Sequence, residues 1–507
     1  MKSFRSLFLL LMLCIILSPL MAGPGSDRNT DGVTTFQMFL VNLGGTPRGL
    51  PEVQEAVNRI IEPQGIRVNL NILDAASFTS QVPVRMASGD PIDLMHPQGG
   101  GTSFVNLLAT NALMDLTDLL PRHGPRLLPT IDEYIPGVIA GTTINGRIMA
   151  VPQLKNKVSN YYLMVRGDLL ARHNLGSLDS LNSLADIERL LTAFRAAEPN
   201  IPAIIPAAGQ SGRMGTLIGA GYDIYDFNNQ VEYIIVDSIG HVDPRDPHTV
   251  INIYRSPHYR RMLETVHRWY QNGLVLRDAA VNQEMAEELV RAGRGFAWFG
   301  RSEIGLEATK SGQTGYPIVA RQINNTIIET TTVRRFAYVV PTIARAPEAA
   351  IKFLELWFTD ERLSSLLAWG VEGRDWIRLP DGTADYPPGV TAQTVAYRSV
   401  DFFTGNQFIT PPWTGNPPDL RQQSVAQHRT TPLSPIFGFS FDPSSVRTEI
   451  AAITSVVDQY VHSLASGTID PAVNLPIFLD ALDRAGAERI IAEQQRQLDA
   501  WWAQQRR

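Results

Sequence analysis

The chain has 507 residues, a net charge of −6 and a hydrophobic content of 44%. Since domains usually span roughly 100–200 residues, this length and composition predict two or three domains with substantial cores. The mild negative charge gives no general attraction to nucleic acid or to anionic lipid, which excludes nucleic acid as a favoured partner.

The N-terminus has the pattern of a secretory signal peptide. Lys2 and Arg5 precede an unbroken apolar run over residues 7–17, which is shorter than the roughly 20 residues of a membrane-spanning helix. We therefore expect residues 1–22 to be a signal peptide and the protein to work outside the cytoplasm. The one cysteine, Cys14, lies in this segment, so the exported part has no thiol for a disulfide, a zinc–thiolate site or an iron–sulfur site.

The next part of the chain predicts a first α/β lobe. Residues 23–35 begin polar and Gly-rich and are expected to form a flexible tether. Beyond them strands and helices alternate, with strands predicted over 36–42, 68–73 and 92–95 and helices over 50–63 and 77–88. Strands separated by helices are typical of parallel βαβ units, so we expect an open α/β sheet in residues 36–150.

A change of pattern near residue 145 marks a crossing into a second lobe. The Asn145-Gly146 pair predicts a hairpin turn, and we assign residues 151–335 to the second lobe. Its predicted elements are strands over 147–151 (the crossing strand), 160–165 and 296–299, and helices over 257–273 and 282–291. A strand over 336–340 then returns to the first lobe.

The return and the C-terminal part complete the predicted organisation. Residues 336–370 return to the first lobe and add two helices near the hinge, over about 347–358 and 360–369. Residues 371–507 are expected to form a C-terminal loop-and-helix segment that packs on the lobes. Its first half is rich in Pro, Gly and aromatic residues, and two amphipathic helices are predicted over 444–464 and 475–502.

Motifs for catalysis, metals and cofactors are missing from the sequence. It contains no Gly-x-Ser-x-Gly elbow, no His-Glu-x-x-His and no phosphate-binding loop. We therefore predict no catalytic residue, no metal and no cofactor, and we do not expect an enzyme. Because a glycosidase needs only two carboxylates facing each other across a sugar, a secreted carbohydrate-active hydrolase remains an alternative.

Several short segments carry a family resemblance. Residues 141–152 (GTTINGRIMAVP), 263–275 (LETVHRWYQNGLV) and 287–298 (EELVRAGRGFAW) resemble, in this order, elements of the carbohydrate-type family 1 of ABC-transporter extracellular solute-binding proteins. Four C-terminal segments narrow the resemblance to the LipO-like lipoprotein subgroup, which has an extra C-terminal domain of unknown function: 369–373 (WGVEG), 404–408 (TGNQF), 438–442 (GFSFD) and 493–499 (EQQRQLD). One departure is Pro24, which stands where a lipid-bearing cysteine is expected.

The resemblance implies an importer receptor with a two-lobed periplasmic-binding-protein-like fold. A saccharide or saccharide-like solute would bind in the hinged cleft between the lobes, and closure would present it to the permease subunits of an ABC importer. We expect a monomer, either extracellular or on the cell surface, where the N-terminus offers a route to the membrane. The expected hinge positions are Val151, Pro152, Val340 and Pro341. A surface binding or adhesion protein without a transport role is a further alternative.

Candidate ligand-binding residues follow from the needs of a sugar site, which combines aromatic platforms with polar hydrogen-bonding groups. Polar candidates come at strand ends and after the crossing strand: Asn42, Asp93, His96, Lys157, Asn160 and Tyr161. Candidates on the second-lobe strand and in the C-terminal loops are Trp298, Trp369, Glu372, Trp376 and Trp413. Two alternatives stay open, since Asp93 could cap a helix and Trp298 could be a core residue.

Overall fold

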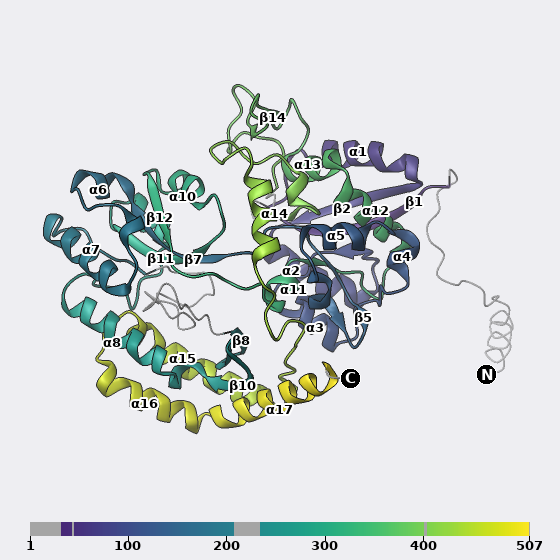
Figure 1. The fold of residues 1–507 in the computed structure, drawn as a ribbon. Helices are drawn as coiled ribbons and strands as arrows, with labels where there is room; N and C mark the ends of the chain where they lie inside the picture. Colours follow the sequence, from purple (N-terminus) through teal and green to yellow (C-terminus); the bar gives the residue numbers. More distant parts are fainter. Residues whose placement is uncertain (1–31, 43–44, 207–233, 400–402, 506–507) are drawn as a thin grey trace, which may run out of the picture.

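Two α/β lobes lie side by side, and three C-terminal helices run along the lower edge of the second lobe (Figure 1). The computed structural model describes residues 32–42, 45–206, 234–399 and 403–505. The predicted signal peptide and most of the predicted tether lie outside the described residues. The arrangement confirms the two-lobed α/β fold that the sequence predicts.

The first lobe is built on the predicted parallel sheet. Its strands are ordered β2–β1–β3, with bounds Thr34–Val41 for β1, Ile66–Leu73 for β2 and Leu94–Met95 for β3. Successive side chains of β1 point to opposite faces of the sheet. Met38 packs with helix α1 (Leu50–Ile61) on one face, and Phe39 packs with helix α2 (Ala75–Ser88) on the other. The sheet is therefore covered on both faces, as parallel sheets usually are.

Short elements complete the first lobe. Asn145 and Gly146 both have positive φ and form the predicted turn between β4 (Thr143–Ile144) and β5 (Arg147–Ile148). The helices of this region are α3 (Phe104–Ala109), α4 (Leu119–His123) and α5 (Leu127–Tyr134). The predicted strand over 147–151 is divided, because β5 ends at Ile148 and a separate strand follows at Val151.

Two crossing segments meet where the lobes join. Strand β6 (Val151–Pro152) leads into the second lobe and pairs antiparallel with β13 (Ala337–Tyr338), which returns from it. Beyond β13, Val339 and Pro341 form bridges to the first lobe, and helices α12 (Pro347–Thr359) and α13 (Glu361–Trp369) follow close to their predicted positions. The expected hinge residues thus lie at one place in the fold, and their movement stays a prediction.

The second lobe has an antiparallel sheet at its centre. Strand β7 (Asn160–Arg166) lies between β11 (Ala297–Ser302) and β12 (Ile318–Gln322), and all seven of its residues are buried. A separate meander consists of β8 (Ile234–Asp237), β9 (Gly240–Asp243) and β10 (Asp246–Asn252). The helices are α6 (Gly167–Arg172), α7 (Leu184–Ala197), α8 (Pro257–Gln271), α9 (Ala286–Arg291) and α10 (Leu306–Thr314), with α11 (Thr330–Arg335) leading back towards β13.

The C-terminal segment divides between the two lobes. Residues 371–399 and 403–430, which include β14 (Ile377–Arg378), β15 (Ala384–Asp385) and α14 (Leu420–Thr430), lie on the first lobe (Figure 1). Helices α15 (Arg447–Ala465), α16 (Pro471–Arg484) and α17 (Ala487–Gln505) share one hydrophobic core with the second lobe. These three helices therefore belong to the second lobe by their packing.

Two helix predictions are corrected by the backbone. The single helix predicted over 475–502 is two helices, because Gly486 has a φ of +98° and separates α16 from α17. A side chain at this glycine would also collide with Glu449 of α15. The helix predicted from residue 282 begins only at Ala286. No helix in the described ranges is long and apolar enough to span a membrane.

His428 connects α14 to the loop after β6, where the chain enters the second lobe. Its Nδ1 lies 2.6 Å from the carbonyl oxygen of Ser424, and its Nε2 accepts the backbone N–H of Lys157 at 2.8 Å. Burial, with a smaller effect of Lys157 and Lys155, lowers the pKa of His428 to about 4. The imidazole of His428 is therefore neutral near pH 7, and its Nε2 can accept the hydrogen bond from Lys157.

We expect acid to destabilise the protein through this group. The folded-state pKa lies below the usual value of about 6.5, so its stability contribution is complete above pH 6.5 and is lost as the pH falls towards 4. The loss reaches about 1.4 kcal/mol per pH unit. The variant His428→Gln should unfold more easily at pH 7.5 but show a shallower decline between pH 6.5 and 4.5 in urea titrations. An unchanged slope would contradict the assignment.

Candidate binding cavity

A cavity of about 700 Å³ lies between the lobes and receives residues from both. The first lobe contributes the loop after β3 and the start of α3, over residues 96–105, together with Phe403. The second lobe contributes strand β8, and the remaining described lining comes from residues 329–336 and 434–443, which run between the lobes. Such a volume is in the usual range for a small-molecule site.

Phenylalanine side chains form much of the apolar lining. The rings come from four separate parts of the chain: Phe104, Phe336, Phe403, Phe439 and Phe441. Phe336 and Phe403 lie 6.3 Å apart between ring centroids, and both contact the ring of His96. Phe336 is half-buried and the other four side chains are buried, with 4–9% of their surface exposed. Aromatic faces suit the C–H faces of a sugar.

His96 supplies an unpaired polar group at the cavity. Its ring is 2% exposed, and its Nδ1 lies 2.7 Å from the side-chain nitrogen of Gln98. Burial, reinforced by the positive charges of Lys157, Lys155 and Arg335, lowers its pKa to about 3. In a neutral ring whose Nδ1 accepts the Gln98 amide, Nε2 carries the proton, and this atom has no hydrogen-bond partner in the described part of the chain. This buried atom is therefore an unsatisfied donor in a residue that lines the cavity.

Positive side chains surround the ring of Phe336. The Nζ atom of Lys155 lies 4.1 Å from the ring centroid, and that of Lys157 lies 5.5 Å from it. Lys155 also pairs with Glu303 of the second lobe at 3.3 Å, and Lys157 donates to the backbone oxygen of Phe336 at 3.1 Å. Burial is the main reason why the pKa of Lys157 is well below its usual value. These contacts hold Phe336 in place at the edge of the cavity.

Two carboxyl groups lie on another part of the lining. Asp237 ends strand β8, and Glu329 directly precedes α11. Burial raises the pKa of both groups, and Arg301 opposes the rise for Glu329. Their oxygens can accept hydrogen bonds from ligand hydroxyls. No cluster of three or more potential metal ligands occurs among the residues that the structure describes.

Comparisons with known proteins agree with this architecture. A curated carbohydrate ABC transporter substrate-binding protein of Streptococcus pneumoniae is 25% identical over 475 residues, covering 91% of this chain and 90% of the relative. The solved N-glycan transport solute binding protein (NgtS) of S. pneumoniae matches with a TM-score of 0.78 at 22% identity, covering 92% of this chain and 98% of that one. The structure of NgtS with Man1GlcNAc matches with a TM-score of 0.68, at the same identity and covering 99% of that chain.

This chain has the solute-binding protein fold. The resemblance that the sequence carries is thereby confirmed, including its C-terminal part, because residues 435–503 match the family model described as a domain of unknown function (DUF3502). The matched segment begins in the cavity lining and ends in α17. In this solute-binding protein fold, the matched segment is therefore continuous with the lining of the interlobe cavity.

Of the predicted ligand-binding residues, only His96 is among the described residues that line the cavity. Lys157 lies just behind it, against Phe336. Asn42 donates to the backbone oxygen of Gly45, and Asn160 accepts the backbone N–H of Thr326. These two buried amides have local structural partners, and their predicted contact with a ligand has no support from the geometry.

Asp93 holds the start of helix α12. Its carboxylate accepts backbone N–H groups from Gln37 in β1 and from Arg345 and Ala346 at the N-terminus of α12, each at 2.7 Å. The sequence-based alternative of a cap on a distant helix describes this arrangement better than a ligand contact. The carboxylate thus connects the central strand of the first lobe to the returning chain.

The aromatic candidates of the second lobe face its core. Trp298 is 1% exposed and packs in the hydrophobic cluster of that lobe, which is the alternative left open by the sequence. Tyr161 stacks on Phe299 at 5.8 Å and is also buried. Because alternate residues of a strand point to opposite faces, a single sequence does not reveal which face meets a cleft.

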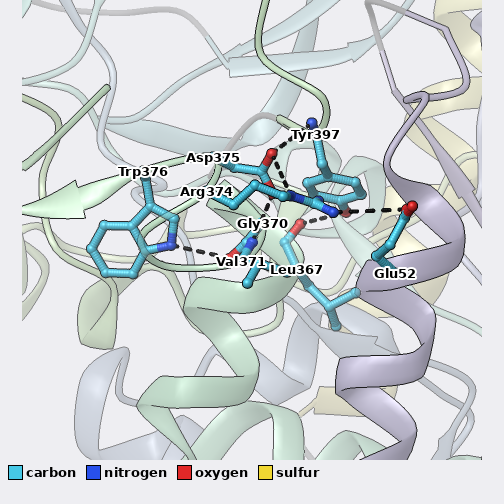
Figure 2. A network of polar contacts seen from close by, with 8 residues as sticks. All are labelled: Glu52, Leu367, Gly370, Val371, Arg374, Asp375, Trp376 and Tyr397. Atoms are coloured by element: carbon cyan, nitrogen blue, oxygen red, sulfur yellow. Dashed lines mark hydrogen bonds and ion pairs between the residues drawn. The ribbon is translucent and has the colours of Figure 1, made fainter. Parts of the chain in front are cut away.

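Trp369, Trp376 and Trp413 form a cluster in the first lobe, outside the described cavity lining. Figure 2 shows how this region is fastened: the Trp376 indole donates to Gly370, and the buried Asp375 accepts from Val371, Arg374 and Tyr397. Glu372 lies on the exposed turn between these contacts. Half-buried Trp413 has the Arg398 guanidinium 4.1 Å from its ring centroid.

Sequence reasoning missed most of the aromatic lining. The sequence places Phe336 in the predicted returning strand over 336–340 and Phe403 among the aromatic residues of the C-terminal loops. The Gly-Phe-Ser-Phe run at 438–441 carries only the family resemblance. Its alternation of phenylalanine with serine is the one local signal that could have indicated an apolar face beside a polar one.

Because Asp93 holds the start of α12 and is not among the described lining residues, we expect its replacement to lower the free energy of unfolding without removing a ligand contact. Asp93→Ala would leave three buried backbone N–H groups without their acceptor, at a cost of about 2–5 kcal/mol. Urea titration should show this loss, whereas Asp93→Asn, which retains one acceptor oxygen, should lose less. Full stability of Asp93→Ala together with loss of ligand binding would restore the ligand-contact interpretation.

Proposed function

We propose that this protein is an extracytoplasmic receptor of an ABC importer that binds a saccharide in the interlobe cavity. This proposal rests mainly on one observation: both lobes and the segments that cross between them contribute residues to the cavity lining. A ligand that contacts all of them stabilises the closed arrangement of the lobes, and the permease then recognises the closed form.

The composition of the cavity supports a saccharide as the ligand class. Phe336 and Phe403 offer flat apolar surfaces, while the Nε2 group of His96 donates and the carboxyl groups of Asp237 and Glu329 accept hydrogen bonds. Sugars present the same combination of apolar faces and polar rims. The relative NgtS was solved with Man1GlcNAc, which makes short mannose–N-acetylglucosamine glycans the first ligands to test.

The two NgtS comparisons also support closure around a ligand. This chain matches NgtS with a TM-score of 0.78 in the structure described without a ligand and 0.68 in the complex. Because the relative is the same, the two scores reflect different shapes of that protein. The present structure is therefore nearer to the first shape, with crossing strands β6 and β13 as the proposed hinge.

Export completes the proposal. The basic and apolar pattern of residues 1–22 supports export of the chain across the membrane, and the curated relative is a carbohydrate ABC transporter substrate-binding protein. We propose that the N-terminus keeps the protein near the cell surface or releases it, and that the receptor carries out no chemistry on its ligand.

Ligand binding should depend on the flat ring of Phe336. In a calorimetric and thermal-shift screen with Man1GlcNAc, kestose and maltotriose, a bound saccharide at 100 times its dissociation constant should add about 2.7 kcal/mol to stability. Phe336→Leu keeps an apolar side chain but removes the aromatic face, so we expect at least tenfold weaker binding. Trp413→Leu is the matched control, since this ring is outside the described lining. Loss of binding in the control alone would refute the cavity assignment.

The absence of chemistry is a separate prediction. The bound saccharide should be recovered intact after prolonged incubation, as measured by mass spectrometry and by the yield of new reducing ends. Glu329→Gln should change its affinity without changing that result, since this carboxyl is proposed as a hydrogen-bonding group only. Slow hydrolysis that disappears in Glu329→Gln or Asp237→Asn would favour the hydrolase alternative.

A further inference from the structure

The segment that opens the DUF3502 match lines the cavity. Residues 434–443 run from α14 on the first lobe to α15 on the second, and they contribute Ile436, Phe439 and Phe441 to the lining. Phe439 and Phe441 are each 7% exposed. We call residues 434–443 the crossing strap.

Arg334 fastens the crossing strap from the side of the hinge. This guanidinium is 6% exposed and donates to the backbone oxygens of Gly438 at 3.1 Å and Phe439 at 3.3 Å. It also donates to Gly141 of the first lobe at 2.8 Å. The carbonyl groups of the strap are thus held in a fixed position relative to the first lobe.

Helix α17 fastens the crossing strap from the second lobe. The Gln497 side chain accepts the backbone N–H of Asp442 and donates to the backbone oxygen of the same residue, both at 2.8 Å. The ring of Trp501 meets Phe439 edge-on, with 5.9 Å between the centroids. One helix therefore holds both the backbone and a lining side chain of the strap.

The same helix also holds strand β8, another part of the cavity wall. Gln494, which is fully buried, donates to the backbone oxygen of Asp237 at 2.8 Å. The helix lies so close to the meander that a Cβ at Gly240 would fall 1.7 Å from Gln494 Oε1. Gln494, Gln497 and Trp501 are spaced three and four residues apart, which places them on one face of α17.

We propose that the DUF3502 segment is the positioning element of the ligand cavity, with α17 as a brace that sets the distance between the crossing strap and β8. That this cavity binds a ligand rests on the proposed function, but the brace itself is a property of the free protein. Gln494, Gln497 and Trp501 are its positioning residues. Phe439 and Phe441 are the rings that it presents to a ligand.

Hydrogen–deuterium exchange on the free protein tests the brace. The double variant Gln497→Ala/Trp501→Ala should raise amide exchange at least tenfold in the crossing strap, while α8 and the sheet around β7 keep their protection. The matched control is Gln504→Ala, at an exposed position of the same helix. This variant should leave the strap unchanged. A purely structural role in the core would raise exchange throughout the second lobe, and that result, or an unchanged strap, would overturn the proposal.

Calorimetry with Man1GlcNAc and Man5GlcNAc gives an independent readout. The brace variant should bind at least tenfold more weakly than wild type while keeping its melting temperature within a few degrees, and Gln504→Ala should bind normally. Wild-type affinity in the brace variant would also overturn the proposal. If wild type binds no saccharide, the proposed function fails, and the exchange experiment still decides whether α17 is a brace.

Discussion

The antiparallel contact between β6 and β13 is the constraint on which the rest of the structure depends. Val151 and Pro152 leave the first lobe beside Ala337 and Tyr338, which return to it. Because the two strands are hydrogen-bonded, the chains that enter and leave the second lobe have to move together. The cavity lining at His96 and Phe336 begins next to this contact, since Phe336 directly precedes β13 and its ring contacts that of His96.

Buried charge at the same junction keeps its residues in place. Lys155 and Lys157 follow β6 and are almost fully buried, and both approach the ring of Phe336. Lys155 pairs with Glu303 of the second lobe. A buried amine is costly unless it has a partner, so these lysines favour one arrangement of the loop that carries them. The neutral rings of His96 and His428 lie within their positive field.

The sequence predicted elements well where local rules determine them. The period-two pattern of residues 68–73 and the proline-led helices at 257 and 347 appear in the structure within a few residues of their predicted bounds. The predictions failed where a distant contact decides. Gly486, in the left-handed region, ends α16, and a side chain at this position would collide with Glu449 of α15. The tryptophans looked like sugar platforms, but Trp369 and Trp376 direct their indole N–H groups to nearby backbone oxygens. The phenylalanine lining comes from segments separated by up to 337 residues, which no local pattern brings together.

The second lobe and the last three helices share one hydrophobic core, and this affects the order in which the chain can fold. The cluster that contains Tyr161 and Trp298 also contains Phe478 and Leu498, so the lobe cannot complete its interior until nearly the whole polypeptide is present. Contacts this distant along the chain make folding slow. A second lobe that is completed last leaves the apolar side chains of its early strands without their final cover until the C-terminal helices have been made.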